Sequence, residues 1–571
     1  MIKTHEADLV RPVLGRLNDD GSITAGSVTS SPELKLRALC HVLPTRVVPI
    51  IFLPGIMGTR LRVRGRERKS AWFPPENTWE EIVQGLAGLF RNAAARQRLL
   101  NPDTTEVDDN GRASPSSDAA TLLGDAPGAT DAERGKWRGW GQLHADSYKE
   151  ILHTLEVRLA HMLENGHVVT QDWHEAVMKW QDADKLGAQK DFIALTEADL
   201  RRAADAFLPV HAVGYNWLQS NKTSAEHLAR EIDRILAYYR SRNKDAEQVV
   251  LVTHSMGGLV ARACAQLPGM QEKILGVVHG VMPALGAPAT YKRIRAGFEG
   301  LPQLVLGRNA ADCTAVMANS PGALELLPTR QYRAQSGGQS GHWLTVEYNG
   351  QKRALGEGDP YADIYLSEMR EAWWRLIKEE LINPAGRKKL EVSRKGRQVQ
   401  EKFNIFGSDF DRYAENIEFA AKFHTSIENR YHPCSFVFYA ADPEHPAWSE
   451  VVWKVGRSKV DGEYLNAALV HDDLNGKVEL SIGDGQCDFK IDGPRGLGDG
   501  TVSQESGAAP ATYAEQIFCH EGKAKGHTSY DHQMAYSSDI AQAVTLYSIC
   551  KILASDDSVE SRVSPAKKTY E

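Results

Sequence analysis

The chain has 571 residues, of which 42% are hydrophobic and 25% are charged, and its formal net charge is -7. This length and composition are typical of a folded protein with a sizeable apolar core, and they exclude a chain that is disordered throughout. The mildly acidic balance gives no electrostatic reason to expect nucleic acid as a partner.

Cysteine usage and the N-terminal residues indicate where the protein is made. The seven cysteines are scattered without a C-x-x-C pair, which is typical of reduced thiols rather than of a disulfide framework. Residues 1–21 are polar and charged, and no segment reaches the roughly 20 apolar residues of a membrane span. We therefore expect synthesis in the cytoplasm without a signal peptide, with any export using a route that needs none.

Apolar runs typical of buried strands alternate with helical patterns along the first half of the chain. The strand patterns cover residues 47–53, 210–217, 249–252 and 274–282, and the helical patterns cover residues 148–163, 224–239 and 259–266. This alternation predicts an α/β fold with a mostly parallel, doubly wound sheet whose chemistry lies at the C-terminal ends of the strands.

Longer segments interrupt and follow this pattern. Residues 301–430 show amphipathic segments without a clear sheet pattern, and we expect a large helical cap over the active site there. A strand pattern at residues 434–439 then returns the chain to the core. The predicted organisation is an N-terminal extension (1–45), a first core segment (46–300) with an insertion at about 65–165, the cap (301–430), a second core segment (431–554) and a flexible tail (555–571).

Residues 249–262 carry the most specific motif. They read V-V-L-V-T-H-S-M-G-G-L-V-A-R, a buried-strand run, a serine near small residues and a helical pattern. A nucleophile elbow has this form, because its serine lies on a strained turn before a helix whose free N–H groups favour negative charge. Ser255 is therefore the candidate nucleophile. Thr253 stands where glycine is more common, so the match is imperfect, and similar strand, turn and helix units occur in other parallel folds.

Acyl transfer also needs two backbone N–H donors for the oxyanion of the tetrahedral intermediate. Met256 follows the serine and would supply one donor. We assign the second to Ile56, in the turn P-G-I-M-G at residues 54–58, although a plain strand-ending turn has the same composition.

A serine hydroxyl needs a base, and the base needs an orienting carboxylate. In α/β hydrolases the chain order is serine, acid, histidine. Asp499, in the glycine-flanked turn G-D-G-T-V, is the predicted acid, with Asp442 as the competing one. His532, shortly before the last helical pattern, is the predicted base, with His527 as the alternative. A turn aspartate that bonds its own backbone and a surface histidine are the commoner fates of such residues.

Several motifs together resemble known families. L-P-G-I-M-G-T-R-L, H-S-M-G-G and G-D-G-T-V resemble lecithin:cholesterol acyltransferase-type lipases. With V-G-Y-N-W-L-Q-S-N, G-A-P-A-T-Y-K-R and D-H-Q-M-A-Y added, the chain more closely resembles the antibacterial phospholipase effectors of type VI secretion, specifically their third family. The shared motifs lie between Leu53 and about Ile552, and the insertions match little.

The resemblance implies an α/β-hydrolase fold and a triad of Ser255, Asp499 and His532, with Thr253 as an accepted variant. It also implies delivery by a contractile injection machine into the periplasm of a rival cell and hydrolysis of membrane phospholipid there. The implied partners are the phospholipid surface, an immunity protein that protects the producer, and a secretion spike or adaptor.

Residues and resemblance together predict a serine hydrolase of phospholipase A type that acts through an acyl-enzyme. Two alternatives stay open. The fold could serve as a binding module without catalysis, or the same triad could act as an acyltransferase or amidase, because transfer differs from hydrolysis only in what attacks the acyl-enzyme.

A surface for membrane contact is expected near the active site of a lipase. Trp373 and Trp374 lie in an apolar segment, and Arg387, Lys388 and Lys389 begin a basic one that could meet anionic headgroups. A helix packed on the core beside a solvated basic loop would have the same pattern.

Serine chemistry requires no cofactor, and the chain has no H-E-x-x-H motif or EF-hand loop. Asp442, Glu444 and His445 are close enough in sequence to share a structural calcium ion, although a simple charged turn is the commoner origin of such a pattern and no motif supports the ion.

Overall fold

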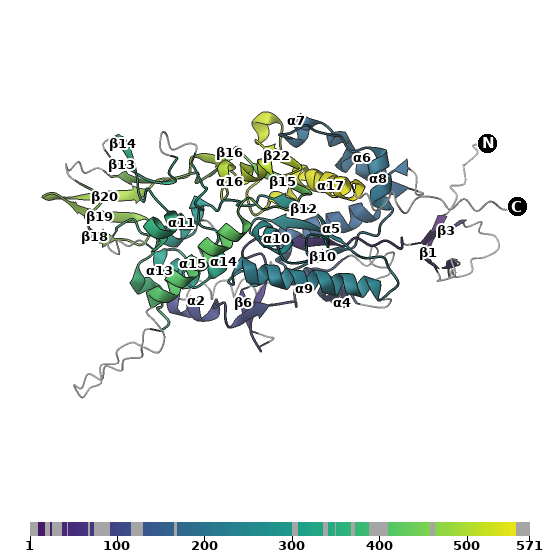
Figure 1. Cartoon of the computed structure of the whole chain (residues 1–571), viewed down its shortest axis with the longest axis horizontal. Helices are drawn as coiled ribbons and strands as arrows, with labels where there is room; N and C mark the ends of the chain where they lie inside the picture. The colour runs from purple at the N-terminus through teal and green to yellow at the C-terminus, as the bar shows by residue number, and fades with distance from the viewer. Residues whose placement is uncertain are drawn as a thin grey trace, which may run out of the picture.

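The computed structural model describes most of the chain. The described residues are 10–17, 23–25, 37–42, 44–66, 69–72, 92–115, 130–164, 168–299, 307–334, 341–348, 350–366, 372–386, 409–456 and 463–555. The view in Figure 1 shows an elongated molecule. At one end lie the strands β13 (Leu344–Tyr348), β14 (Gln351–Ala354), β18 (Ala468–Asp472), β19 (Lys477–Ile482) and β20 (Gly485–Ile491). At the other end lies the small sheet of β1 (Val10–Leu17), β2 (Ile23–Ala25) and β3 (Arg37–Val42).

A six-stranded sheet forms the centre of the molecule, with the strand order β10-β4-β11-β12-β15-β22. Every pair of neighbouring strands in it is parallel. Its strands are β4 (Ile50–Leu53), β10 (Val210–Ala212), β11 (Val249–His254), β12 (Ile274–Gly280), β15 (Ser435–Ala440) and β22 (Gln516–His520). The predicted α/β-hydrolase class with a parallel sheet is confirmed.

Both faces of this sheet are buried. Along β4, Ile50 and Phe52 belong to one apolar core, whereas Ile51 and Leu53 belong to the other, because successive side chains of a strand point to opposite faces. A strand buried on both faces reads as an unbroken apolar run, which is why these strands are visible in the sequence.

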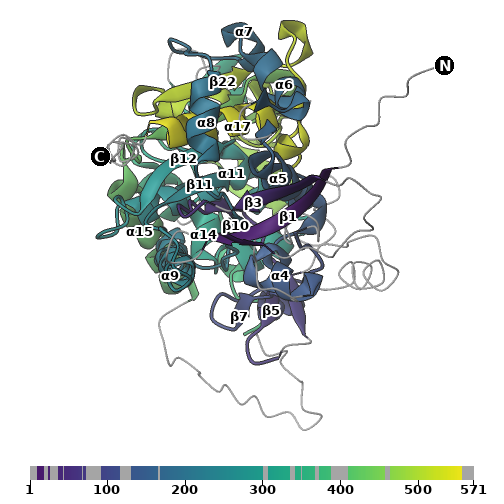
Figure 2. The same cartoon turned by 90° about the vertical axis from the view of Figure 1, so that its right-hand side faces the viewer.

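Helices cover the two faces of the central sheet. The face of Ile51 packs against α9 (Asn221–Arg240) and α10 (Gly257–Ala265). The opposite face packs against α5 (Ala145–Ala160), α8 (Glu197–Ala204) and α17 (Asp539–Ala554). Figure 2 shows α9 and α17 on opposite sides of β10 to β12.

The segment predicted as an insertion at about 65–165 contributes to this core. Its last helix, α5, buries Tyr148, Ile151 and Leu155 in the same core as α17. The rest comprises α2 (Ala93–Leu99), α4 (Asp131–Trp137), and the strands β6 (Ser70–Trp72) and β7 (Thr105–Val107), which pair with β5 (Leu61–Val63). The shorter elements α6 (Gln171–Ala176), α7 (Ala183–Leu186), β8 (Leu163–Glu164) and β9 (Val168–Val169) follow.

A second six-stranded sheet is ordered β14-β13-β17-β20-β19-β18 and is mostly antiparallel. Two of its strands, β13 and β14, come from the predicted cap (301–430), whereas β17 to β20 come from the segment predicted as the second part of the core (431–554). We call this sheet and the helices that share its apolar core the cap. This differs from the expected helical cap. Its strands are β13 (Leu344–Tyr348), β14 (Gln351–Ala354), β17 (Val451–Val455), β18 (Ala468–Asp472), β19 (Lys477–Ile482) and β20 (Gly485–Ile491). Most residues of β14 and β18 are exposed or half-buried, so they leave no apolar run in the sequence.

Helices pack beside the second sheet and share its apolar core. Tyr291 of α11 (Pro288–Ala296) and Tyr413 of α15 (Asp409–Ile427) lie in one cluster with Trp453 of β17. The cap also includes α13 (Ala310–Met317) and α14 (Pro321–Leu324). Across the described part of the chain, none of the helices has the length and apolar character needed to cross a membrane.

Candidate active site

Ser255 lies at the turn between β11 and α10. Its φ of 53° is left-handed, a conformation that costs an L-residue about 1 kcal/mol. The serine is 3% exposed, and its backbone N–H donates to the Gly280 carbonyl at 2.9 Å. A Cβ on Gly257 would lie 2.7 Å from the carbonyl oxygens of Leu53 and Pro54, so only glycine lets α10 start this close to β4. The predicted elbow is present.

Thr253 occupies the position where glycine is more common in this motif. It is the fifth residue of β11 and is fully buried, with Oγ1 at 3.2 Å from Nδ1 of His279 on the neighbouring β12. Burial lowers the pKa of His279 to about 3, so the ring is neutral. The threonine hydroxyl thus has a polar partner, and extended strand geometry suits its β-branched side chain.

Three side chains from distant segments meet beside the elbow. His532 Nε2 lies 2.8 Å from Ser255 Oγ, and His532 Nδ1 lies 2.8 Å from Asp499 Oδ2. Asp499 is 2% exposed and the His532 side chain 13% exposed. The carboxylate is therefore screened from bulk water, whereas the imidazole ring stays partly accessible. The structure brings together the serine, acid and histidine that the sequence analysis selected.

The Asp499 carboxylate is held by its own turn, between β21 (Gly496–Gly498) and α16 (Gln504–Ala508). Its Oδ1 accepts from the backbone N–H groups of Thr501 at 3.0 Å and Val502 at 2.7 Å. These two donors fix the carboxylate and leave Oδ2 for the imidazole. The turn bonding that the sequence analysis considered as an alternative therefore coexists with the contact to His532.

The two alternative residues lie in other contacts. His527 Nε2 lies 2.8 Å from the Asp184 carbonyl, and its Nδ1 accepts from the Glu521 N–H at 3.0 Å. Asp442 Oδ1 accepts from the Glu444 N–H at 2.8 Å, and its Oδ2 accepts from the Ser529 hydroxyl. These hydrogen bonds join loop segments to one another, and neither residue is bonded to Ser255 or His532.

The turn after β4 lies against the elbow. A Cβ on Gly55 would lie 2.8 Å from His254 Nδ1 and 3.0 Å from Ser255 Cβ. Gly58 N–H donates to Gly55 O at 3.0 Å, and Met57 takes a left-handed φ of 66°.

The expected oxyanion donors lie on this turn and on the elbow. Within the described segments, the N–H groups of Ile56 and Met256 have no hydrogen-bond acceptor. Such N–H groups beside a buried serine can stabilise an oxyanion.

Comparison with known proteins identifies the family. Residues 217–300, which include the elbow, match the family described as PGAP1-like alpha/beta domain. No curated protein sequence matches the chain. A solved structure described as the Tle4-Tli4 complex is 30% identical over 89% of this chain and 99% of the other, with a TM-score of 0.71. The chain belongs to the Tle4 family of type VI secretion lipase effectors.

The Tle4 family assignment agrees with the resemblance found in the sequence to type VI secretion lipases. The motifs indicated the third family of these effectors, and the solved relative that carries the assignment is named Tle4. Membership also makes the chain an α/β hydrolase of lipase type.

In this Tle4-family chain the predicted membrane contact through Trp373 and Trp374 is wrong. Both tryptophans are buried, at 1% and 7% exposed, in the core of the cap. Trp373 Nε1 donates to the Tyr464 carbonyl at 2.9 Å, which fixes the ring inside. The apolar segment is therefore core and does not face a membrane. Arg387, Lys388 and Lys389 lie outside the described residues.

The residues considered for a calcium ion are spread over separate contacts, since Glu444 pairs with Lys523 at 3.0 Å while Asp442 turns to Ser529. No three His, Cys, Asp or Glu side chains gather as a metal would require in the segments that the structure describes.

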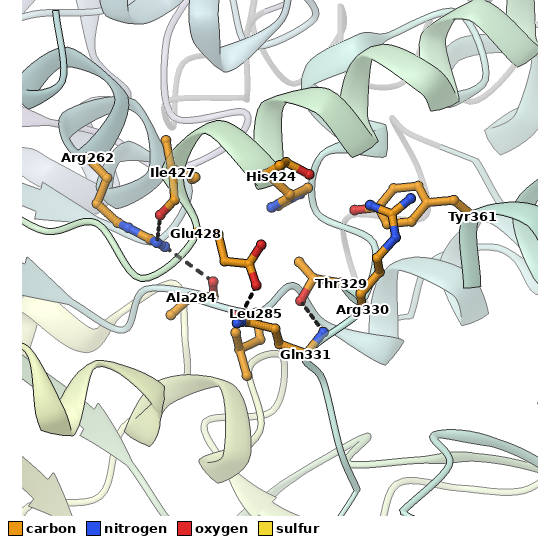
Figure 3. Close-up of a pocket in the computed structure, with 11 residues that line it drawn as sticks. Arg262, Ala284, Leu285, Thr329, Arg330, Gln331, Tyr361, His424, Ile427 and Glu428 are labelled. Atoms are coloured by element: carbon orange, nitrogen blue, oxygen red, sulfur yellow. Dashed lines mark hydrogen bonds between the residues drawn. The ribbon is translucent and has the colours of Figure 1, made fainter. Parts of the chain in front are cut away.

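A pocket separate from the triad lies between α10, α15 and the loops after β12 and α14 (Figure 3). Arg262 reaches toward it from α10, but its guanidinium donates to the backbone carbonyls of Ile427 and Ala284. Gln331 Nε2 donates to Glu428 at 2.6 Å across the same pocket. Arg262 and Gln331 are thus hydrogen-bonded to other protein groups, and this Tle4-family pocket contributes no group to the triad.

Tyr148 and His254 are two further residues of the site that no sequence motif predicted. Tyr148 OH lies 2.9 Å from His254 Nδ1, directly behind the nucleophile. A tyrosine in an amphipathic helix of an insertion carries no motif, so only its place in the fold reveals this contact.

Proposed function

We propose that this chain is a phospholipase A-type serine hydrolase that cleaves acyl esters of membrane phospholipid. The hydrogen-bonded line from Asp499 through His532 to Ser255 carries the proposal, with 2.8 Å at each step. Membership of the lipase effector family supports the substrate class.

The first half of the reaction follows from this geometry. Ser255 Oγ attacks the acyl carbonyl carbon while His532 Nε2 takes the hydroxyl proton. Asp499 holds the ring through Nδ1–H and stabilises the imidazolium. The N–H groups of Ile56 and Met256 donate to the oxyanion, and a single such donor is worth about 3–4 kcal/mol. His532 then returns the proton to the leaving lysophospholipid alcohol, which leaves an acyl-serine.

The second half releases the product. His532 takes a proton from water, whose oxygen attacks the acyl-serine, and then returns a proton to Ser255 as the fatty acid leaves. No metal enters either half. We expect a chelator to leave fatty-acid release unchanged.

In the cell, we propose delivery of the enzyme by type VI secretion into the periplasm of a competitor. The Tle4 structure is described as a complex with Tli4, and we infer a cognate immunity protein for this chain as well. A secretion spike or adaptor is expected to load it.

Active-site labelling tests the proposal directly. A fluorophosphonate should label the wild type, while Ser255→Ala and His532→Gln should remain unlabelled. His527→Gln is the matched control and should label like the wild type. An inert wild type would favour a binding module.

Product analysis then separates the enzyme classes. With phosphatidylethanolamine and phosphatidylglycerol vesicles, the wild type should release free fatty acid and lysophospholipid. Acyl esters of an added alcohol as the main product would indicate a transferase, and hydrolysis of peptide substrates without lipid would indicate an amidase.

A growth assay tests the cellular role. Periplasm-targeted wild type should lyse the expressing cells, and Ser255→Ala should not. Growth unaffected by an active wild-type enzyme would contradict the antibacterial role while leaving the chemistry intact.

A further inference from the structure

A second hydrogen-bonded line runs behind the candidate triad. The Gly55 N–H donates to Tyr148 OH at 3.1 Å, and Tyr148 OH lies 2.9 Å from His254 Nδ1. His254 Nε2 lies 2.8 Å from the backbone carbonyl oxygen of His532. The line therefore connects the turn after β4 with the loop that carries the histidine, through α5 and the residue before the nucleophile.

The protons along this line have one consistent arrangement. Gly55 N–H can only donate and the His532 carbonyl can only accept, so His254 Nε2 must carry a hydrogen. Burial, with the nearby His532 ring second, lowers the pKa of His254 to about 3, so the ring is neutral and Nδ1 is bare. Tyr148 must then donate to Nδ1, and burial raises its pKa so that it keeps its proton. Every polar group in the line is satisfied.

The line also holds the backbone carbonyl of His532. Its N–H already donates to the Asp499 carbonyl at 2.8 Å, and its C=O accepts from His254. The peptide groups on both sides of the reacting ring are thus tied, one to the acid turn and one to the elbow. His254 and Tyr148 are both only 1% exposed, so water does not compete for these bonds.

We propose that His254 and Tyr148 are positioning residues that keep the oxyanion turn and the His532 ring in register with Ser255. The proposal rests on the proposed function, because it concerns the same hydroxyl, ring and N–H donors. Neither residue touches the reacting atoms. A displacement of about 1 Å in such a site can lower the rate by about 100-fold.

Two substitutions at one position separate the ends of the line. In His254→Gln the amide nitrogen takes the place of Nε2 and still donates to the His532 carbonyl. In His254→Asn the side-chain amide takes the place of Nδ1, so the contact with Tyr148 remains and the bond to His532 is lost. Tyr148→Phe removes only the hydroxyl that joins Gly55 to His254.

Kinetics on a soluble acyl ester give the first readout. We expect His254→Asn, which loses the bond to the His532 carbonyl, to lower kcat about 100-fold with KM changed by less than about 3-fold. His254→Gln keeps that bond and loses only the Tyr148 contact, so it should lower kcat about 10-fold. Tyr148→Phe should lower kcat about 10-fold.

Binding of a long-chain trifluoromethyl ketone gives the second readout, because its adduct with serine resembles the tetrahedral intermediate. Its affinity should fall by the same factor as kcat/KM in each variant. A role in stability alone would lower the melting temperature and leave this affinity unchanged.

The outcomes are distinct. Equal kcat values for His254→Asn and His254→Gln, or a Tyr148→Phe enzyme with wild-type kcat, would overturn the positioning role. If His254→Asn does not fold, Tyr148→Phe decides the matter, since it removes one oxygen atom and leaves the aromatic ring in the core. A wild type that does not react with the ketone would instead remove the proposed function.

Discussion

The C-terminal end of the central sheet and the core of the cap bury very different side chains. At that end, Ser255, Asp499 and His254 are buried polar groups that are hydrogen-bonded to one another or to shared neighbours around a serine with a left-handed backbone. In the cap, Trp373 and Trp453 pack edge to face at 5.4 Å within an aromatic core. The first arrangement selects one geometry at a cost in strain, whereas the second supplies stability with no reactive group.

This contrast predicts that substitutions in the triad change kcat with little change in the free energy of unfolding. Substitutions in the core of the cap should lower the free energy of unfolding with little change in kcat.

Asp499→Asn should lower kcat about 10⁴-fold, because the amide no longer accepts from His532 Nδ1–H and the ring loses its tautomer. Asp442→Asn is the matched control, since Asp442 is as deeply buried and pairs with Gly498, the residue before Asp499. Its kcat should stay within about 3-fold of the wild type. Ester hydrolysis at saturating substrate measures both. A larger loss in Asp442→Asn would transfer the acid role to that residue.

Trp453→Ala should lower the free energy of unfolding by about 3–5 kcal/mol, because it leaves a large cavity between Trp373 and Tyr291. Its kcat at low temperature should be close to that of the wild type. Urea unfolding and hydrolysis assays on one preparation give both numbers. Phe419→Ala, at a side chain 56% exposed, is the control and should change stability by less than about 0.5 kcal/mol. A rate loss in Trp453→Ala would break the contrast.

Stability should fall as the pH is lowered from about 6.5 toward 3. Burial lowers the pKa of His254, His279 and His520 to about 3, well below the usual 6.5. In this window the unfolded chain binds more protons than the folded one, so stability is present above pH 6.5 and lost on acidification.

For each such histidine, the free energy of unfolding falls by about 1.4 kcal/mol per pH unit of acidification within this window. His279→Asn keeps a polar partner for Thr253 and should reduce the slope of unfolding free energy against pH by this contribution of one histidine. Urea unfolding at several pH values measures that slope. Parallel curves for wild type and variant would contradict the assignment.

The smallest effect concerns strain at the elbow. Ser255→Gly should be about 0.5–1 kcal/mol more stable than Ser255→Ala, because glycine adopts the left-handed φ without a Cβ clash, partly offset by its freedom in the unfolded state. Both variants lack the hydroxyl, so the comparison isolates the backbone. Equal stabilities would show that the turn carries no strain.

The structure also shows why some features were visible in the sequence and others were not. The strands of the central sheet are buried on both faces, so β11 reads as an unbroken apolar run that ends at the elbow. Strands β14 and β18 of the cap sheet are exposed or half-buried along their whole length, so they leave neither an apolar run nor an alternating pattern in the sequence. Burial of Trp373 and Trp374 was equally hidden, because an apolar segment has the same composition whether it packs inward or faces a membrane.

The sequence by itself determined the α/β class, the elbow at Ser255 and the order of acid and histidine along the chain, because strand burial, turn strain and glycine placement are local properties of neighbouring residues. Only the tertiary structure decided that His532 rather than His527 lies beside a serine 277 positions away, and that Tyr148 reaches His254 from an insertion. Contacts of that kind depend on strand order and loop packing, which no local pattern encodes.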